Sequence, residues 1–303
     1  ALVSTPSYDV NKMVLGVTQD EWNEISNNEK TPMLARYLQK YCPGSTFKPI
    51  TGAIGLTTNS LTKDDTFNYS GLSWQKDSSW GTYNITTLTA YNGAKNLKNA
   101  LIHSDNIYFA QAALKIGSKN ITSGLDKIKF NENIDFELNL AKSQYSNDGK
   151  IEKETLLADT GYGQGQILVN PVHMASIYSA FYNGGNMVKP YLEYKEKTEP
   201  EYLVQNAFSK EASDEIKNDL IQVVEDPEGT AKDMKINGMT IAGKTGTAEL
   251  KVSKEEKADT IGWFDCFTVT NENPYLVIGM VEKANQNGGS HYLIPMIKKI
   301  FIK

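Results

Sequence analysis

A change in sequence pattern near residue 235 constrains the fold more than any other feature. Before it, apolar residues recur at helical spacing in three segments, which are 97–114, 174–181 and 216–224. After it come strand-like runs at 239–248, 260–269 and 275–282, and then an amphipathic helical pattern at 291–301. Helices gathered in the middle of a chain and strands at its end predict an α+β protein with a largely antiparallel sheet.

The remaining segments allow narrower predictions. Residues 60–100 are rich in Ser, Thr, Asn, Asp and aromatic residues without periodicity, which indicates irregular loops or short strands. Residues 1–6 are typical of the end of a strand, and 271–274 of a turn between the second and third strand-like runs. Because the chain begins with Ala1, we expect it to be cut from a longer protein, with any signal or anchor segment upstream.

Composition excludes several classes of function. The chain has 303 residues, enough to bury a sizeable core, and carries 31 basic against 36 acidic residues. A net charge of −5 without a long basic run does not fit a nucleic-acid-binding protein. Two cysteines and three histidines exclude a disulfide scaffold and a four-cysteine zinc site, and no metal or other cofactor is predicted. The longest apolar runs are far shorter than the roughly 20 residues of a membrane helix.

Ser45-Thr-Phe-Lys48 is an S-x-x-K motif, which places a hydroxyl and an amine one helical turn apart. A serine hydroxyl is a weak nucleophile until a base removes its proton, and a lysine is such a base only when its pKa is lowered. Burial, a second cation and the positive end of a helix dipole all lower it. Taken alone, the motif is better explained as a helix N-cap followed by a solvated lysine.

Two further short motifs carry polar side chains. Ser104-Asp-Asn106 offers a second hydroxyl for proton relay and an amide that could hold a substrate carbonyl or the lysine head. The alternative is a polar turn between two helices. Lys244-Thr-Gly-Thr247 lies in a strand-like run, where Gly246 would let a substrate backbone lie close and the lysine with the threonine hydroxyls could bind a carboxylate. The alternative is an edge strand with a solubilising lysine.

Residues 238–245 also match the G-x-x-x-x-G-K-[ST] pattern of phosphate-binding loops. Such a loop needs a buried strand before it, a helix directly after its Lys-Thr pair and a further parallel sheet downstream. Here the following residues are strand-like and only 58 residues remain, so we reject a nucleotide site.

The order and spacing of the three motifs favour a functional interpretation over three unrelated structural ones. Ser104 follows Ser45 by 59 residues and Lys244 follows Ser104 by 140. S-x-x-K, S-D-N and K-T-G in this order are the signature of penicillin-binding proteins and serine β-lactamases. Over nearly its whole length the chain resembles the transpeptidase domain of class B penicillin-binding proteins, and most closely the low-affinity, methicillin-resistance type. The segments that carry the resemblance are 1–9, 43–48, 104–110, 156–165, 243–250 and 261–264.

The resemblance implies a β-lactamase/transpeptidase-like fold. In such a fold an antiparallel sheet flanked by helices is joined to a mainly helical subdomain, and the active site lies between them. On this basis the sheet subdomain would comprise about 1–40 and 235–303, and the helical subdomain about 41–234.

The resemblance also implies a role for each motif residue. Ser45 would be the acylated nucleophile and Lys48 its proton acceptor. Ser104 would pass the proton to the leaving group, and Asn106 would position the substrate amide. The substrate-binding residues would be Lys244, Thr245, Gly246 and Thr247, with the lysine and the threonines on the terminal carboxylate. The backbone N–H groups of Ser45 and Thr247 would form the oxyanion hole.

The implied reaction is attack on a peptidoglycan stem peptide that ends in D-Ala-D-Ala. The last D-Ala would leave, and the acyl group would pass to an amine of a neighbouring strand. Penicillins and other β-lactam antibiotics would acylate the same serine. The implied location is the extracytoplasmic face of the bacterial cell membrane, with an N-terminal anchor through which other cell-wall synthesis proteins could bind.

Two related functions remain alternatives. A serine β-lactamase shares all three motifs but also needs a base for deacylation, and Asp135-Phe-Glu-Leu-Asn139 nearly matches the E-x-x-L-N loop of class A enzymes. The glycine-rich segment 161–165 resembles transpeptidases and counts against this alternative. A non-enzymatic β-lactam sensor domain also keeps the serine and lysine, but such sensors lack an intact S-D-N motif.

Three other side chains could be reactive: those of His103, Cys42 and Cys266. His103 beside Ser104 suggests a Ser-His-Asp arrangement, but there is no G-x-S-x-G elbow, so we predict a helix-end residue. Cys42 is predicted to be a small buried residue, and its pairing with Cys266 is left open.

Overall fold

A computed structural model of the chain describes residues 1–193, 196, 199–249, 259–269 and 274–302. The helices are α1 (Val10–Leu15), α2 (Gln19–Ser26), α3 (Lys48–Thr57), α4 (Leu97–Ile102), α5 (Asn106–Ile116), α6 (Ser118–Lys127), α7 (Glu154–Gly161), α8 (Pro171–Tyr182), α9 (Lys210–Glu225) and α10 (Ile294–Phe301). The strands are β1 (Ser73–Trp74), β2 (Ile85–Thr86), β3 (Met187–Val188), β4 (Tyr202–Val204), β5 (Ile241–Glu249), β6 (Thr260–Thr268) and β7 (Leu276–Val281). Short 3₁₀ helices are η1 (Arg36–Leu38), η2 (Gly44–Phe47), η3 (Ser78–Trp80), η4 (Lys232–Met234), η5 (Ala284–Gln286) and η6 (Gly289–Leu293). Within the described ranges, no helix combines the length and apolar character needed to cross a membrane.

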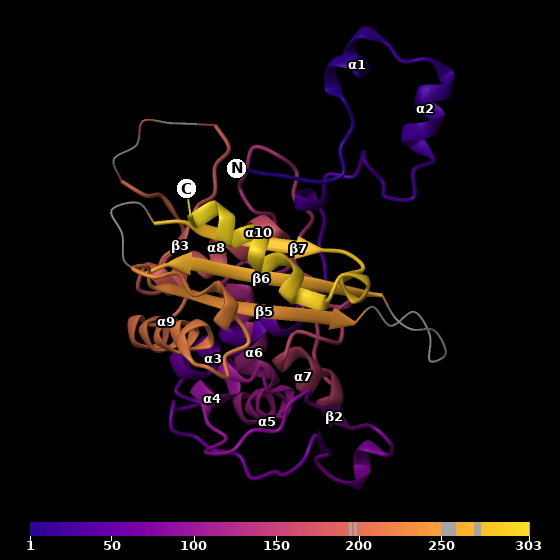
Figure 1. The fold of residues 1–303 in the computed structure, drawn as a ribbon. Coiled ribbons are helices and arrows are strands. Elements are labelled where there is room, and N and C mark those ends of the chain that lie inside the picture. Colours follow the sequence, from indigo (N-terminus) through magenta and orange to yellow (C-terminus); the bar gives the residue numbers. More distant parts are fainter. Residues whose placement is uncertain (194–195, 197–198, 250–258, 270–273, 303) are drawn as a thin grey trace.

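The central sheet contains β5, β6 and β7 in that order, each antiparallel to its neighbour (Figure 1). Lys244 of β5 lies opposite Asp265 of β6, which in turn lies opposite Ile278 of β7. The three strands match the three strand-like runs, so the predicted α+β class with an antiparallel sheet is confirmed. Within the expected turn between β6 and β7, residues 271–273 lie outside the described residues.

Both faces of this sheet are covered. On one face α10 packs against β7, where a Cβ added to Gly279 would lie 2.6 Å from Ile297 Cδ1. On the other face η2 contacts β5 and β6, and the fully buried Trp263 donates its indole N–H to Cys42 O at 2.9 Å. Because β6 is covered on both sides, its residues are buried almost without interruption instead of alternating with exposed ones.

The helices predicted around the S-D-N motif are present as α4 and α5. Asp105 caps α5, because its Oδ1 accepts the backbone N–H groups of Ile107 at 2.9 Å and Tyr108 at 3.3 Å. Most of α5 is buried, and it packs against α3 and α7. The core therefore holds the turn that carries the motif.

The other predicted helices also form, with different ends. The segment around 174–181 lies in α8 and that around 216–224 in α9. The closing helix at 291–301 begins as η6 and becomes α-helical only at Ile294. Residues 60–100 hold only the short strands β1 and β2, η3 and the start of α4, as predicted.

Some elements were not predicted from the sequence. They are α1, α2, α6, α7, β3 and β4. The packing of α7 illustrates the reason, because its last residue, Gly161, lies so close to α5 that an added Cβ would be 2.4 Å from Phe109 O. Tertiary contact of this kind has no periodic sequence signal.

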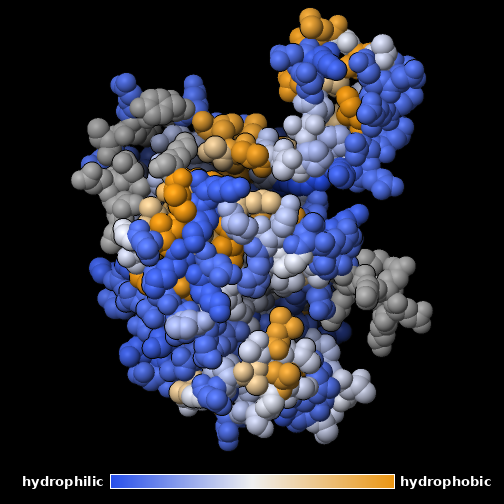
Figure 2. Space-filling model, viewed as in Figure 1, coloured by the Kyte–Doolittle hydropathy of each residue, from blue (hydrophilic) through white to orange (hydrophobic). Residues whose placement is uncertain are grey.

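Residues 1–40 differ most from expectation. Residues 1–6 are irregular, so the prediction of a strand end is wrong, and no described residue of 1–40 lies in a strand. Helices α1 and α2 project from the rest of the molecule and bury no residue (Figure 1). Apolar residues of α1 are exposed, among them Val14, and Figure 2 shows hydrophobic surface within this projecting segment. The assignment of 1–40 to a sheet subdomain stays a prediction.

Candidate active site

Ser45 and Lys48 lie where η2 continues into α3. Ser45 is within the 3₁₀ turn, and Lys48 is the first residue of the α-helix. In 3₁₀ geometry residues i and i+3 eclipse each other. The Nζ atom of Lys48 accordingly lies 2.9 Å from Ser45 Oγ. Lys48 is fully buried, so the alternative of a solvated lysine is wrong.

The Nζ atom of Lys48 is surrounded by oxygen atoms. Its hydrogen-bond neighbours are Ser45 Oγ at 2.9 Å, Ser104 O at 2.6 Å, Ser104 Oγ at 3.1 Å and Asn106 Oδ1 at 2.7 Å. Burial, and after it the charge of Lys244, hold the pKa of Lys48 well below its ordinary value, while Asp105 acts in the opposite direction. An ammonium group cannot accept a hydrogen bond, whereas a neutral amine can. The arrangement therefore suits a lysine that accepts the proton of Ser45.

Ser104 joins the two lysines of the motifs. Its Oγ lies 3.1 Å from Lys48 Nζ and 2.9 Å from Lys244 Nζ. Its backbone φ is 54°, in the left-handed region that residues other than glycine rarely adopt. This conformation brings both its carbonyl oxygen and its hydroxyl to Lys48. Such strain is found where the surroundings impose it, and it is concentrated at functional sites.

The other two residues of the S-D-N turn are also engaged. Asp105 is fully buried, and its Oδ2 accepts the hydroxyl proton of Tyr69, a residue that the motifs did not indicate. Asn106 accepts from Lys48 through Oδ1 and donates from Nδ2 to Thr86 O at 2.8 Å. Of the two possibilities for this amide, the structure therefore has it on the lysine head.

Lys244 is fully buried within β5, so the alternative of a solubilising edge lysine is wrong. Its Nζ donates to Ser104 Oγ at 2.9 Å and to Thr245 O at 3.0 Å. Burial lowers the pKa of Lys244 to about 7, and the charge of Asp265 opposes this decrease. The hydroxyl of Thr245 donates to the Thr230 hydroxyl at 2.9 Å. Thr230 and Asp265 belong to no motif, so sequence reasoning did not find them.

Two glycines allow η2 to approach β5 closely. Gly44 has a φ of 52°, and an added Cβ would lie 2.5 Å from Thr247 O. A Cβ on Gly246 would lie 2.8 Å from Thr46 Cγ2. The space that we expected beside Gly246 for a substrate backbone is thus occupied, on that side, by Thr46. The approach brings the backbone of the Ser45 turn next to that of Thr247.

His103 and the cysteines behave as ordinary structural residues. His103 ends α4, as predicted, and its ring stacks on Tyr91 with centroids 4.1 Å apart. Cys42 is buried, as predicted, and its thiol donates to Gly163 O at 3.1 Å. Cys42 and Cys266 are both free.

Two alternative sites receive no support from the described residues. The Lys-Thr pair of the phosphate-loop pattern lies inside β5, where a nucleotide site would need the start of a helix. Among the described residues, no group of three or more His, Cys, Asp or Glu side chains is placed to hold a metal ion.

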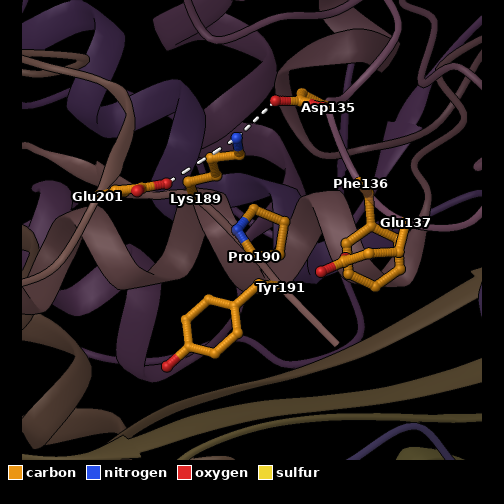
Figure 3. Close-up of a pocket in the computed structure, with 7 residues that line it drawn as sticks. All are labelled: Asp135, Phe136, Glu137, Lys189, Pro190, Tyr191 and Glu201. Atoms are coloured by element: carbon orange, nitrogen blue, oxygen red, sulfur yellow. Dashed lines mark ion pairs between the residues drawn. The ribbon is translucent and has the colours of Figure 1, made fainter. Parts of the chain in front are cut away.

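The near match to a β-lactamase deacylation loop lines a separate surface pocket. The pocket has a volume of about 190 Å³ and is lined by Asp135, Phe136, Glu137, Lys189, Pro190, Tyr191 and Glu201. Figure 3 shows the Lys189 ammonium between Asp135, at 2.5 Å, and Glu201, at 3.9 Å. Within the part of the chain that the structure describes, no hydrogen bond or ion pair links Asp135 or Glu137 to the Ser45 site.

The family is decided by comparison with known proteins. The family described as "Penicillin binding protein transpeptidase domain" matches residues 1–301 of the chain. The chain belongs to this family. "Penicillin-binding protein 3" of Bacillus subtilis (strain 168) is 42% identical over 302 residues, which cover 99% of this chain and 45% of that protein. "Peptidoglycan D,D-transpeptidase MrdA" of Haemophilus influenzae is 26% identical over 329 residues, which cover 99% of this chain and 50% of that protein.

Solved structures of penicillin-binding proteins share the fold. Penicillin-binding protein A from M. tuberculosis, solved as an imipenem acyl-enzyme complex, gives a TM-score of 0.81 at 22% sequence identity. The match covers 99% of this chain and 70% of that chain. The predicted transpeptidase fold is thus confirmed. The chain spans about half the length of the curated relatives it matches.

Proposed function

We propose that this penicillin-binding protein domain is a D,D-transpeptidase that cross-links peptidoglycan through a serine acyl-enzyme. One observation carries the proposal: Ser45, Lys48, Ser104 and Lys244 form a continuous series of hydrogen-bond contacts at 2.9–3.1 Å. A series of this kind can take a proton from a nucleophile and return it to a leaving group. Relatives named peptidoglycan D,D-transpeptidase support the same function.

In the proposed acylation, Ser45 Oγ attacks the carbonyl carbon between the last two D-Ala residues of a stem peptide. Lys48 accepts the hydroxyl proton as the C–O bond forms. The proton passes through Ser104 to the amine of the terminal D-Ala, and the C–N bond breaks. An amine of a neighbouring strand then attacks the ester carbonyl and loses a proton to the same lysine. The ester C–O bond breaks, and the lysine returns that proton to Ser45 Oγ.

Binding of the donor relies on the K-T-G strand. The Lys244 ammonium and the hydroxyls of Thr245 and Thr247 bind the terminal carboxylate, and Gly246 keeps the strand close to the Ser45 turn. The N–H groups of Ser45 and Thr247 stabilise the oxyanion, because preorganised donors act strongly where negative charge develops. Asn106, which holds Lys48, is within the same turn as Ser104 and positions the substrate amide.

We also infer the wider setting from the family. The domain works on the extracytoplasmic face of the cell membrane, in a longer protein with an N-terminal anchor and, through it, contacts to other cell-wall synthesis proteins. Residues 235–303 with about 1–40 form its sheet subdomain and 41–234 its helical subdomain. We assign it, by resemblance, to the low-affinity, methicillin-resistance type.

A labelled penicillin tests the proposal. The protein is mixed with fluorescent penicillin, and the covalent adduct is followed by gel fluorescence and intact-mass measurement. We expect an adduct that lasts many minutes, and release of D-Ala with formation of cross-linked product when stem peptide and an amine acceptor are supplied. Turnover of the drug within seconds would indicate a β-lactamase instead. A stable adduct without any strand-transfer product would indicate a sensor domain.

A further inference from the structure

Asp265 is a fully buried carboxyl group in the middle of β6 that no step above uses. It lies opposite Lys244 in the register of β5 and β6. Residues opposite each other in antiparallel strands place their side chains on the same face of the sheet. Among the described residues, neither carboxyl oxygen of Asp265 has a hydrogen-bond partner. A buried carboxyl without partners is costly, and its nearest basic neighbour in the sheet is a lysine of the site.

The groups packed over Asp265 come from η2 and α8. The Thr46 hydroxyl donates to Pro43 O at 2.9 Å, and the Tyr178 hydroxyl donates to Thr46 O at 2.7 Å. Both hydroxyl protons are therefore used by backbone oxygens. The titratable groups that interact with Asp265 are Lys244, Tyr178 and Cys266, and of these only Lys244 carries positive charge.

We propose that Asp265 is a positioning residue that acts through Lys244, by supplying the negative charge that keeps the Lys244 ammonium protonated while it binds the donor's carboxylate. The inference rests on the proposed function, because it needs Lys244 to bind that carboxylate. It concerns only proton occupancy within the Asp265–Lys244 pair, and no bond is made or broken.

The electrostatics of the pair agree with this role. Burial lowers the pKa of Lys244, and the opposing charge of Asp265 limits this decrease, so that the pKa is about 7. Burial likewise raises the pKa of Asp265 well above its ordinary value, and the charge of Lys244 opposes that increase. Each group therefore stabilises the charged form of the other against the effect of burial, and the two titrate as a coupled pair.

Removing the Asp265 carboxyl should change the pH dependence of acylation. Without Asp265, Lys244 loses its proton at lower pH, so the carboxylate of the substrate is bound over a narrower pH range. The groups that face Lys244 are otherwise Ser104 and Lys48, and neither supplies negative charge. The alkaline side of the pH profile should therefore move toward neutral pH.

The test compares Asp265→Asn and Asp265→Leu with the wild-type domain. The second-order rate constant for acylation by fluorescent penicillin is measured across pH. We expect the alkaline limb of both variants to move down by about one pH unit, which is about a tenfold loss on that limb. A penicillin methyl ester, which has no carboxylate, should lose much less. Asp219→Asn, which removes another buried carboxyl, is the matched control and should keep the wild-type profile.

The outcomes separate this inference from the proposed function. If the wild-type protein forms no penicillin adduct, the proposed function fails. If the wild-type protein is acylated and the Asp265 variants have the same pH profile of acylation as the wild type, Asp265 is only structural and the inference is overturned. A measurement on the wild type covers the case in which neither variant folds. In ¹³C NMR, the Asp265 carboxyl resonance should be that of an ionised group at every pH where Lys244 is protonated and the protein is acylated, and a carboxyl that stays protonated there would overturn the inference.

Discussion

The amine of Lys48 and the hydroxyl of Ser45 are 2.9 Å apart, one at the start of an α-helix and the other in the 3₁₀ turn that leads into it. The N-terminal end of α3 adds a partial positive charge beside the lysine, which favours the neutral amine. Burial and Lys244 act in the same direction on the pKa of Lys48. Local geometry therefore supplies the contact, and the surroundings supply the basicity.

Ser45→Ala should abolish the penicillin adduct without unfolding the domain. The substitution removes the attacking oxygen but leaves the turn, which is anchored by the buried Phe47. Intact-mass measurement after incubation with penicillin tests this, and the free energy of unfolding should change by no more than about 1 kcal/mol. Ser7→Ala, at an exposed position, is the control for adduct formation. An adduct that persists in Ser45→Ala would place the nucleophile elsewhere.

Lys48→Met should slow acylation by about 10²- to 10⁴-fold at neutral pH, because it removes the general base and keeps the volume of the side chain. Stopped-flow or quench measurements of adduct formation give the rate. Lys115→Met, which breaks a surface ion pair with Asp65, should react as the wild type does. An unchanged rate in Lys48→Met would exclude this lysine as the base.

The rate of acylation should show a bell-shaped dependence on pH. At low pH Lys48 is protonated and cannot accept the serine proton, so the rate rises as pH passes its lowered pKa. At high pH Lys244, whose pKa is lowered to about 7, loses the charge that binds carboxylate, so the rate falls. The profile of the second-order rate constant measures both limbs. A rate that keeps rising well above neutral pH would contradict the assignment of Lys244.

Gly44→Ala should destabilise the domain and impair acylation. An added Cβ would meet the Thr247 backbone at 2.5 Å, so η2 must move away from β5, and the positive φ adds about 1 kcal/mol of strain. Gly288→Ala is the control, because Gly288 also has a positive φ, 89°, lies in the left-handed helical region and has nothing within 4 Å of an added Cβ. Thermal unfolding and penicillin labelling of both variants give the comparison. Equal losses in the two variants would show that only the φ matters.

Asp219→Asn should stabilise the domain in a pH-dependent manner. Burial, and then Glu215, raise the pKa of Asp219 to about 7 in the folded protein, against an ordinary value of 3.8. Asp219 therefore keeps its proton up to a higher pH in the folded state than in the unfolded state. The free energy of unfolding falls as pH rises from about 4 to 7. The variant should gain up to about 4 kcal/mol at pH 8 and almost nothing at pH 4. Denaturant unfolding at both pH values tests this, and a gain independent of pH would contradict it.

The positions of the motif residues along the chain were enough to predict most of the candidate site. The structure brings residues of S-x-x-K, S-D-N and K-T-G together in one cluster, in which Ser104 contacts both Lys48 and Lys244. Their roles in the reaction stay predictions. Thr230 and Asp265 were missed, since each meets the K-T-G strand only through tertiary contact or strand register.

Sequence alone determined the class of the fold and the order of its parts, because periodicity and spacing are local properties of a chain. Helical spacing predicted α5, α8 and α9, and strand-like runs predicted β5 to β7. Only the tertiary structure decided that Lys48 is buried, that Ser104 has a left-handed backbone and that Asp265 faces Lys244. These features depend on segments as far as 140 residues apart, which packing brings together and no local pattern encodes.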